Sequence, residues 1–244
     1  KAVHQAADAD SPLELAPLIT NLSSFCSANP FIQDIALVLD RSGSMAGAPL
    51  TNMKAGAKTF IDIIAESTGG QPSGEIGAGS CIGIVSFADT AVQDTQLITS
   101  VADLKDAVDA LSAGGSTNHA GAFEQATALF DPSSSNARVI VMFTDGNTTT
   151  GVPPAPVAAA ARAQGITIYC IGLIGSDGVD VSALNDWATD PDAAHVAVTP
   201  DAADLEALFA QLAANISKPG ATNTVINEVL DPDFTITNIV TPAK

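Results

Sequence analysis

The residues best suited to chemistry in this chain lie in the short segment Asp40-Arg41-Ser42-Gly43-Ser44, directly after an apolar run. Asp40 supplies a charged oxygen, and the hydroxyls of Ser42 and Ser44, at alternate loop positions, can turn toward one point. Gly43 between them lets the backbone bend tightly. Magnesium binds about six oxygen ligands and usually retains some water. The segment therefore predicts part of a site for a hard divalent cation.

Further oxygen ligands come from two other parts of the chain. Thr117 lies in a second glycine-rich segment, Gly114-Gly115-Ser116-Thr117-Asn118, and Asp145 follows a second apolar run. If all three loops emerge at one edge of a sheet, they form an oxygen-only site of low charge with an open coordination position. Such a site suits Mg²⁺, with Mn²⁺ or Ca²⁺ as alternatives. The predicted metal ligands are Asp40, Ser42, Ser44, Thr117 and Asp145.

Strand and helix signals alternate through the middle of the chain, and these elements must position the loops. Continuous apolar runs predict buried strands, which cover residues 35–39, 81–87, 139–143 and 166–173, with a short strand at 195–198 and an exposed edge strand within 90–99. Helical spacing predicts helices over residues 50–66, 101–111, 120–130, 156–164, 181–187 and 200–216. The alternation predicts an α/β fold, a doubly wound and mostly parallel sheet with helices on both faces. Such sheets bind ligands at the carboxyl ends of their strands.

The two ends of the chain differ from its middle. Residues 1–30 lack a helical period and contain several prolines, whereas residues 225–240 alternate in the manner of β structure. We expect an N-terminal arm over 1–30, an α/β domain over 31–217 and a β-like segment over 218–244. The last segment belongs to a small appendage or begins an adjoining domain. We therefore expect the chain to be part of a larger multidomain protein.

The three loops, in this order, resemble those of a known family. Asp40-Arg41-Ser42-Gly43-Ser44 has the Asp-x-Ser-x-Ser form of the metal-ion-dependent adhesion site in von Willebrand factor type A and integrin I domains. Residues 114–118 resemble that family's threonine loop, and Phe143-Thr144-Asp145-Gly146 resembles its aspartate loop. The resemblance covers residues 31–217 and implies a Rossmann-like fold. Ser116 is a departure, because the extra serine in Gly-Gly-Ser-Thr could shift the threonine loop.

The resemblance implies a role for each metal ligand. Asp40 would contact the metal mainly through water, while Ser42 and Ser44 would bind it directly. Thr117 would bind directly in the ligand-ready state, and Asp145 would hold a coordinated water. An Asp or Glu carboxylate of a protein ligand would complete the shell. The last predicted helix could then shift and couple affinity to the rest of the molecule.

Charge makes several classes of partner unfavourable. The chain has nine Lys and Arg against 27 Asp and Glu, a formal net charge of −18. Such a surface repels phosphate backbones and anionic lipid, so nucleic acid and membrane surfaces are poor partners. No stretch comes near the roughly 18 apolar residues that a membrane helix needs, so direct insertion is not expected. Solubility is the simplest explanation of the charge. The more specific alternative is an electrostatic field that concentrates cations near a metal site.

The three cysteines cannot all pair within one chain. Cys170 lies in an apolar run and should be a small buried hydrophobe. Cys26 precedes the first core strand and Cys81 begins another. If those strands are parallel neighbours, both sulfurs lie near one edge of the sheet. A Cys26–Cys81 disulfide and two free thiols are then the open alternatives, and a disulfide would imply an oxidising compartment.

Other polar residues near the loops have simpler explanations than metal chemistry. We expect His119 in the first turn of a helix, pointing to solvent, with a role at the rim or in pH response as the alternative. His195 should be structural. Arg41 and the turn 147–150 should lie around the metal and shape ligand choice. The sequence contains no nucleophile elbow, Walker loop or dinucleotide fingerprint.

These observations predict a cation-dependent adhesion or recognition module, extracellular or at the cell surface, that is not an enzyme. The alternative is an intracellular scaffold or enzyme subunit, because the same kind of domain occurs in chelatase and chaperone-like assemblies. The acidic balance, the possible disulfide and the β-like end favour the outside location. A metal-dependent hydrolase ranks last, since no general base has support from the sequence.

Overall fold

The computed structural model describes residues 32–77, 79–174 and 178–217, and within them six strands form one sheet. The strand order is β3-β2-β1-β4-β5-β6. β3 runs antiparallel to β2, and the other neighbouring strands are parallel. The strands are β1 (Gln33–Asp40), β2 (Cys81–Phe87), β3 (Ala91–Gln93), β4 (Ala137–Thr144), β5 (Ile166–Leu173) and β6 (Val196–Thr199).

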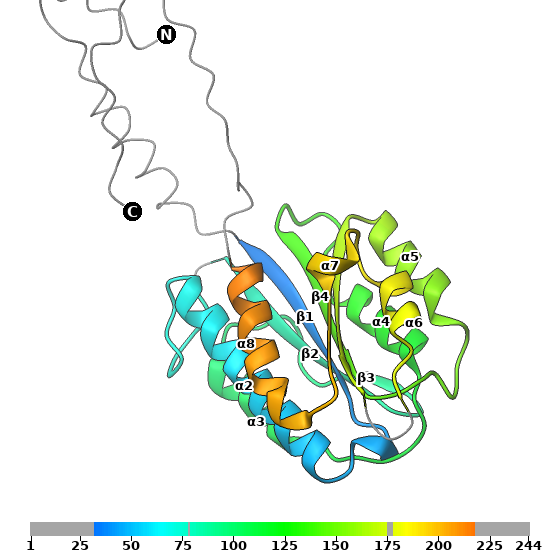
Figure 1. The fold of residues 1–244 in the computed structure, drawn as a ribbon. Helices are drawn as coiled ribbons and strands as arrows, with labels where there is room; N and C mark the ends of the chain where they lie inside the picture. The colour runs from blue at the N-terminus through cyan, green and yellow to red at the C-terminus, as the bar shows by residue number, and fades with distance from the viewer. Residues whose placement is uncertain (1–31, 78, 175–177, 218–244) are drawn as a thin grey trace, which may run out of the picture. The chain divides into compact units, whose positions relative to one another are not determined.

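Helices cover both faces of this sheet (Figure 1). One face carries α2 (Ala48–Ser67), α3 (Val101–Ala110) and α8 (Leu205–Ile216), and the other carries α4 (His119–Ala128), α5 (Pro154–Ala163) and α6 (Val181–Trp187). The shorter elements are η1 (Gly43–Met45), α7 (Asp192–His195) and η2 (Ala202–Asp204). This arrangement confirms the predicted α/β class, a doubly wound and mostly parallel sheet between two helical layers.

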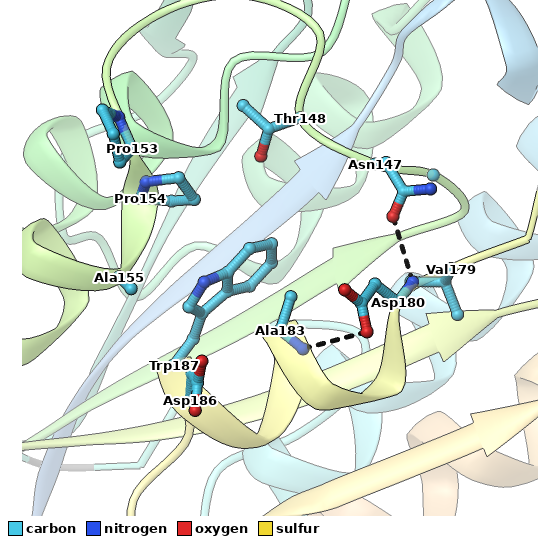
Figure 2. A pocket seen from close by; sticks show the side chains of 11 residues that line it. Asn147, Thr148, Pro153, Pro154, Ala155, Val179, Asp180, Ala183, Asp186 and Trp187 are labelled. Carbon is cyan, nitrogen blue, oxygen red and sulfur yellow. Dashed lines mark hydrogen bonds between the residues drawn. The ribbon is translucent and has the colours of Figure 1, made fainter.

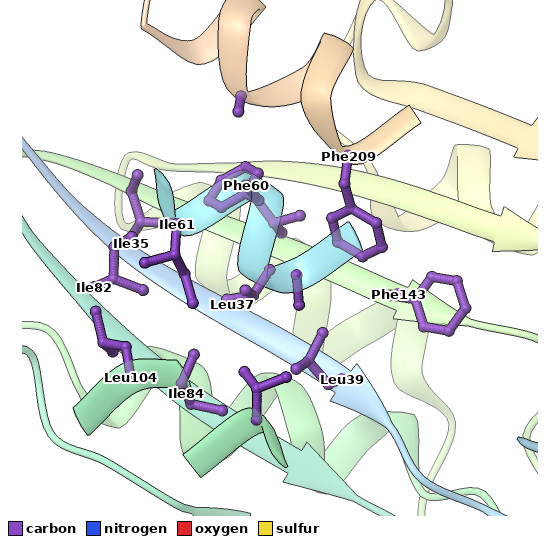
Figure 3. Packing of buried hydrophobic residues seen from close by; sticks show 14 of the residues in the cluster. Ile35, Leu37, Leu39, Phe60, Ile61, Ile82, Ile84, Leu104, Phe143 and Phe209 are labelled. Atoms are coloured by element: carbon purple, nitrogen blue, oxygen red, sulfur yellow. The ribbon is translucent and has the colours of Figure 1, made fainter. Parts of the chain in front are cut away.

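The central strand β1 is buried along its whole length. Ile35, Leu37 and Leu39 face the core beneath α2, α3 and α8, which Figure 3 shows from close by. Ala36 and Val38 face the second core, beneath α4, α5 and α6. Burial on both faces explains why this strand is a continuous apolar run rather than an alternating one. Because both sides are filled, the loop that follows β1 leaves from a fixed point.

β1 and β4 lie where the strand order reverses. From β1 the chain crosses to β2 and β3 on one side, and it then returns to β4, β5 and β6 on the other. Ligands of doubly wound sheets bind at the carboxyl ends of the strands at such a switch point. β1 ends at Asp40, and β4 ends at Thr144, one residue before Asp145. The topology therefore places both predicted acidic ligands at the switch point.

The segment 90–99 departs from the predicted edge strand. Only Ala91–Gln93 forms a strand. The backbone N–H groups of Asp94 and Thr95 both donate to the carbonyl oxygen of Ile84, at 2.9 and 3.2 Å. Two residues that share one partner on the neighbouring strand interrupt a regular ladder, as in a bulge. The segment pairs with β2 again at Ile98, which exchanges backbone hydrogen bonds with Ile82 at 2.9 and 3.0 Å, so it does not form one continuous edge strand.

Several predictions concern residues that the structure does not describe. The arm over 1–30 and the β-like segment over 218–244 lie outside the described residues, as does Cys26 of the proposed disulfide. The division of the chain at these boundaries stays a prediction. Cys170 is buried, as predicted. None of the helices within the described ranges is long and apolar enough to span a bilayer.

Candidate metal centre

The loop after β1 turns back so that its backbone contacts the carboxylate of Asp40. Asp40 is fully buried, and its Oδ1 accepts a hydrogen bond from the backbone N–H of Ser42 at 2.8 Å. The chain continues into η1, where the N–H of Gly43 donates to the carbonyl oxygen of Gly115 at 2.9 Å. A Cβ at Gly43 would lie 3.3 Å from that oxygen, so a larger residue would push the two loops apart. The first and second predicted loops are therefore in direct contact.

Serine hydroxyls connect the β1 loop to the β4 loop. The Oγ atoms of Ser42 and Ser44 lie 3.1 Å apart, and Ser44 Oγ donates to Oδ1 of Asp145 at 2.7 Å. Ser42 and Asp145 are buried, whereas Ser44 is exposed. The cluster is thus closed on its Asp40 side and open to solvent at Ser44, where a ligand can approach.

The threonine loop lies against the β1 loop through its glycines. The N–H of Gly114 donates to the carbonyl oxygen of Arg41 at 2.9 Å, next to the Gly43–Gly115 bond. Gly115 has a φ of 85°, in the left-handed region that favours glycine. A Cβ there would also lie 2.5 Å from Oδ2 of Asp89. The backbone conformation therefore favours glycine at position 115, and a larger residue would also displace the side chain of Asp89.

Thr117 is held by the loop after β4. Its backbone N–H donates to Oγ1 of Thr149 at 2.8 Å, and its carbonyl oxygen accepts from the N–H of Thr149 at 3.0 Å. Thr117 is 5 % exposed. The structure joins four predicted ligands, Asp40, Ser42, Ser44 and Asp145, in one series of hydrogen bonds. It places the fifth, Thr117, in a loop that is bonded to both of the others.

The electrostatics of the cluster favour a cation. Burial raises the pKa of Asp40 to about 6; hydrogen bonds from Ser42 and Thr144 act in the opposite direction, and repulsion from Asp145 adds to the rise. Among the described residues, no group of three or more His, Cys, Asp or Glu could hold a metal ion, so hydroxyl oxygens are an essential part of this donor set. Carboxylate and hydroxyl oxygens suit Mg²⁺, Mn²⁺ or Ca²⁺. The residues present therefore fit a divalent cation, whose charge would offset the burial of two like charges.

His119 does not point to solvent, and this prediction was wrong. It is the first residue of α4, and its side chain is fully buried. Its ring packs against Phe87 and Trp187, with ring centroids 5.2 and 4.7 Å away. Burial lowers the pKa of His119 to about 3, so the ring is neutral. The prediction failed because the covering ring of Trp187 comes from α6, far along the chain.

Hydrogen bonds around His119 have a definite direction. Thr144 has one hydroxyl proton and donates it to Oδ2 of Asp40 at 2.6 Å. Nε2 of His119, 2.9 Å from the same threonine oxygen, must therefore be the donor to it. A neutral imidazole has one N–H, so Nδ1 accepts from the hydroxyl of Thr148 at 2.8 Å. A directed series thus runs from Thr148 through His119 and Thr144 to Asp40.

Other polar residues expected around the metal have partners of their own. Arg41 Nε donates to Oγ of Ser86 at 3.2 Å. Asn147 accepts at Oδ1 from the backbone N–H of Asp180 at 3.1 Å, which ties the β4 loop to the start of α6. Their influence on ligand choice stays a prediction. His195 ends α7, and its Nδ1 lies 3.0 Å from a backbone carbonyl oxygen, in keeping with the structural role expected for it.

The sequence did not indicate the roles of Thr144 and Trp187, and it placed Thr148 near the metal without its hydrogen bond to His119. Thr144 did carry a signal, because a hydroxyl at the end of a strand buried on both faces needs a hydrogen-bond partner. Trp187 carried no signal of this kind. It is the only tryptophan of the chain, and its contact with His119 exists only once α6 packs beside α4.

The arrangement of these loops agrees with a comparison to known families. The family model of the von Willebrand factor type A domain matches residues 34–211, which is most of the chain. The chain belongs to the von Willebrand factor type A (VWA) family. The match includes all three loops of the candidate metal centre in this VWA domain.

Relatives of this VWA domain include a curated protein and solved structures. Human Matrilin-3 is 27% identical over 183 residues, which cover 70% of this chain and 34% of that protein. Proximal thread matrix protein 1 from the mussel byssus, solved with a zinc-occupied MIDAS motif, is 20% identical with a TM-score of 0.61, over 77% of this chain and 48% of that one. The pilus adhesin SpaC from Lactobacillus rhamnosus GG is 17% identical with a TM-score of 0.65, over 78% and 31%. The two solved structures show that the fold is shared. The match to this chain covers about a third of the length of Matrilin-3.

Proposed function

We propose that this VWA domain is a cation-dependent adhesion or recognition module and not an enzyme. Its divalent cation, Mg²⁺ or alternatively Mn²⁺ or Ca²⁺, supplies positive charge and an open coordination position for an Asp or Glu carboxylate of a protein ligand. The residues that would hold the cation are Asp40, Ser42, Ser44, Thr117 and Asp145.

The observation that carries this proposal is the hydrogen-bonded series from Asp40 through Ser42 and Ser44 to Asp145. Both ends of the series are buried carboxylates, and the exposed member between them is the hydroxyl of Ser44. Ser42 and Ser44 are the direct ligands in this account, and the two acids act through coordinated water. A ligand carboxylate can approach only from the side of Ser44, where the cluster meets solvent.

The relatives support the kind of module and its setting. One structural neighbour is a matrix protein with a zinc-occupied MIDAS motif, and another is a pilus adhesin. We therefore place this domain outside the cell or at the cell surface, within a larger multidomain protein. The share of Matrilin-3 that it covers, 34%, is in keeping with one module among several.

Binding of a carboxylate tests the proposal. The isotope-labelled full chain, in excess Mg²⁺, is titrated with a short peptide containing one Asp, and separately with its Asn counterpart. We expect the Asp peptide alone to shift the amide signals of Gly115, Thr117 and Gly146. The shifts should vanish in EDTA and in Ser44→Ala, but persist in the exposed control Ser133→Ala. Equal shifts with the Asn peptide, or shifts that survive EDTA, would contradict the proposal.

A further inference from the structure

A cavity of about 360 Å³ lies beside the metal centre. Its wall is formed by the loop after β4, the beginning of α5 and α6 (Figure 2). Gly146, Asn147 and Thr148 line it and directly follow Asp145. A Cβ at Gly146 would lie 3.9 Å from Oγ of Ser44, so the cavity wall reaches the exposed hydroxyl of the centre. A ligand bound at the metal therefore has this cavity next to it.

The cavity combines an apolar interior with acidic residues. Trp187, Pro154 and Val179 supply apolar surface, and Trp187 is almost fully buried against His119. Asp180 and Asp186 also line the cavity, and both are exposed. Among the described residues that line the cavity, none is Lys or Arg. The cavity therefore complements a side chain with an apolar stem and a positive end.

The position of one acid is set by the metal-site loop. Asp180 caps α6, and its Oδ1 accepts from the N–H groups of Ser182 and Ala183 at 2.9 and 3.3 Å. Its own backbone N–H donates to Oδ1 of Asn147 at 3.1 Å, two residues after Asp145 (Figure 2). The carboxylate is thus held at a fixed place relative to the metal centre, and it does not have to be ordered when a ligand binds.

We infer that this cavity binds a basic side chain, Lys or Arg, of the same protein ligand whose carboxylate binds at the metal centre; the inference rests on the proposed function. The alkyl stem lies against Trp187 and Pro154, as long cationic side chains do on apolar surfaces. The charged end lies near Asp180 and Asp186. An extended ligand advances about 3.3 Å per residue, and the cavity wall reaches Ser44 at Gly146, so we expect the basic residue close to the acid in the ligand sequence. The ligand is then recognised by a paired acid and base.

The test uses the single tryptophan of the chain, Trp187, as a reporter in the cavity wall. The full chain in Mg²⁺ is titrated with two sets of short peptides, in which one Asp lies one to three positions from Lys or from norleucine. Norleucine keeps the apolar stem and removes the charge. For at least one spacing we expect the Lys peptide to change the emission of Trp187 and to bind about fivefold more tightly, the size of one exposed ion pair.

Matched acid variants separate the cavity from the general negative field. Asp180→Asn keeps a helix-capping side chain and removes the charge. Asp201→Asn does the same at another exposed cap, whose Oδ1 accepts from the N–H of Ala203 at 2.9 Å and which does not line the cavity. We expect the preference for Lys to fall below about twofold in Asp180→Asn and to persist in Asp201→Asn. The affinity of the norleucine peptide should stay the same in both.

The outcomes distinguish the two proposals. If Lys and norleucine peptides bind equally at every spacing and only with Mg²⁺, the metal-bridge function stands and the cavity inference is overturned. A Lys preference that survives in Asp180→Asn also overturns it. If the preference and the emission change persist in EDTA, the cavity takes the basic residue without a metal bridge, which contradicts the proposed function and, with it, the pairing of acid and base. Absence of binding by every peptide would contradict both.

Discussion

Asp40-Arg41-Ser42 and Asp131-Pro132-Ser133 form the same local turn at opposite edges of the sheet. In each, the aspartate Oδ1 accepts from the backbone N–H of the serine two residues later, at 2.8 Å. The surroundings differ. Asp131 is exposed, and hydrogen bonds from Ser133 hold its pKa below the ordinary value, whereas burial raises the pKa of Asp40 to about 6.

In our proposal, the Asp-x-Ser turn alone is not sufficient for a metal site. Asp131 precedes β4 at the amino edge, where water solvates its charge. Asp40 ends a strand filled on both faces, so its charge is removed from water and lies near that of Asp145. Only at the carboxyl edge do two further loops add oxygens to the turn. We therefore expect a cation at the turn where burial and like charge coincide.

The largest expected effect is a loss of metal affinity when the Asp40 turn is removed. The same pair of alanine substitutions at the Asp131 turn should have almost no effect. Asp40→Ala/Ser42→Ala should lower the affinity for Mg²⁺ or Mn²⁺ by more than about 100-fold, because direct ligands matter more than outer partners, whose loss lowers affinity about 10–100-fold. Asp131→Ala/Ser133→Ala should stay within about twofold of the wild type, as expected for surface substitutions away from a site. Calorimetric titration of the metal-free proteins measures both. Equal losses of metal affinity in the two variants would contradict the proposed difference between the turns.

A smaller loss of metal affinity should follow when the hydroxyl of Thr144 is removed. Thr144 donates to Oδ2 of Asp40, so Thr144→Val leaves a buried carboxylate oxygen without that donor. We expect metal affinity to fall about 10-fold or more, while Thr144→Ser, which keeps the hydroxyl, should retain most of it. Calorimetry on the two variants decides the matter, and identical affinities for Val and Ser would show that this hydrogen bond does not support the centre.

The smallest effect is on how the free energy of unfolding depends on pH. It reports the burial of His119, whose hydrogen bonds lead to Asp40. His119 has a pKa of about 3 when folded and 6.5 ordinarily, so the unfolded chain binds its proton first as the pH falls. The stability linked to neutral His119 is complete above pH 6.5 and is lost as the pH falls toward 3. Between pH 7 and 5 this amounts to about 2 kcal/mol.

Comparison with His119→Gln isolates that loss, because glutamine keeps one donor and one acceptor and does not titrate. Urea unfolding in EDTA at the two pH values gives the difference between the proteins. The raised pKa of Asp40 makes the fold more stable as the pH falls, in the wild type and in the variant alike. Only the difference between the two proteins therefore reports on His119. We expect the wild type to lose about 2 kcal/mol more than the variant between pH 7 and 5. Equal losses would mean that His119 is solvated in solution.

Much of this architecture was predictable because burial on both faces leaves a mark on the sequence. Continuous apolar runs indicated β1, β2, β4 and β5, and most predicted elements lie within two residues of their observed bounds. The positions of the loops after β1 and β4 followed from the rule for the carboxyl edges of doubly wound sheets, whereas the threonine loop joins two helices and was assigned by the family resemblance. Their hydrogen-bonded contacts, such as Gly43 with Gly115, were consistent with that rule but not derivable from it.

What could not be predicted depends on contacts between elements that are distant in the chain. The burial of His119 requires Trp187, which lies on another helix. The cavity requires Asp180 to bond Asn147 across two loops. The interrupted pairing after Gln93 depends on how two N–H groups share one carbonyl oxygen. Periodicity reports which face of an element is buried, and it does not report which partner buries it.

The most direct test of the account is to locate the ion itself. Crystals of the full chain soaked in Mn²⁺ give an anomalous signal that identifies the metal without assumptions about its ligands. We predict one strong peak within coordination distance of the Ser42 and Ser44 hydroxyls, and none at the exposed Asp131 turn. A peak at both turns, a peak that does not contact these serines, or no peak at the carboxyl edge would contradict it.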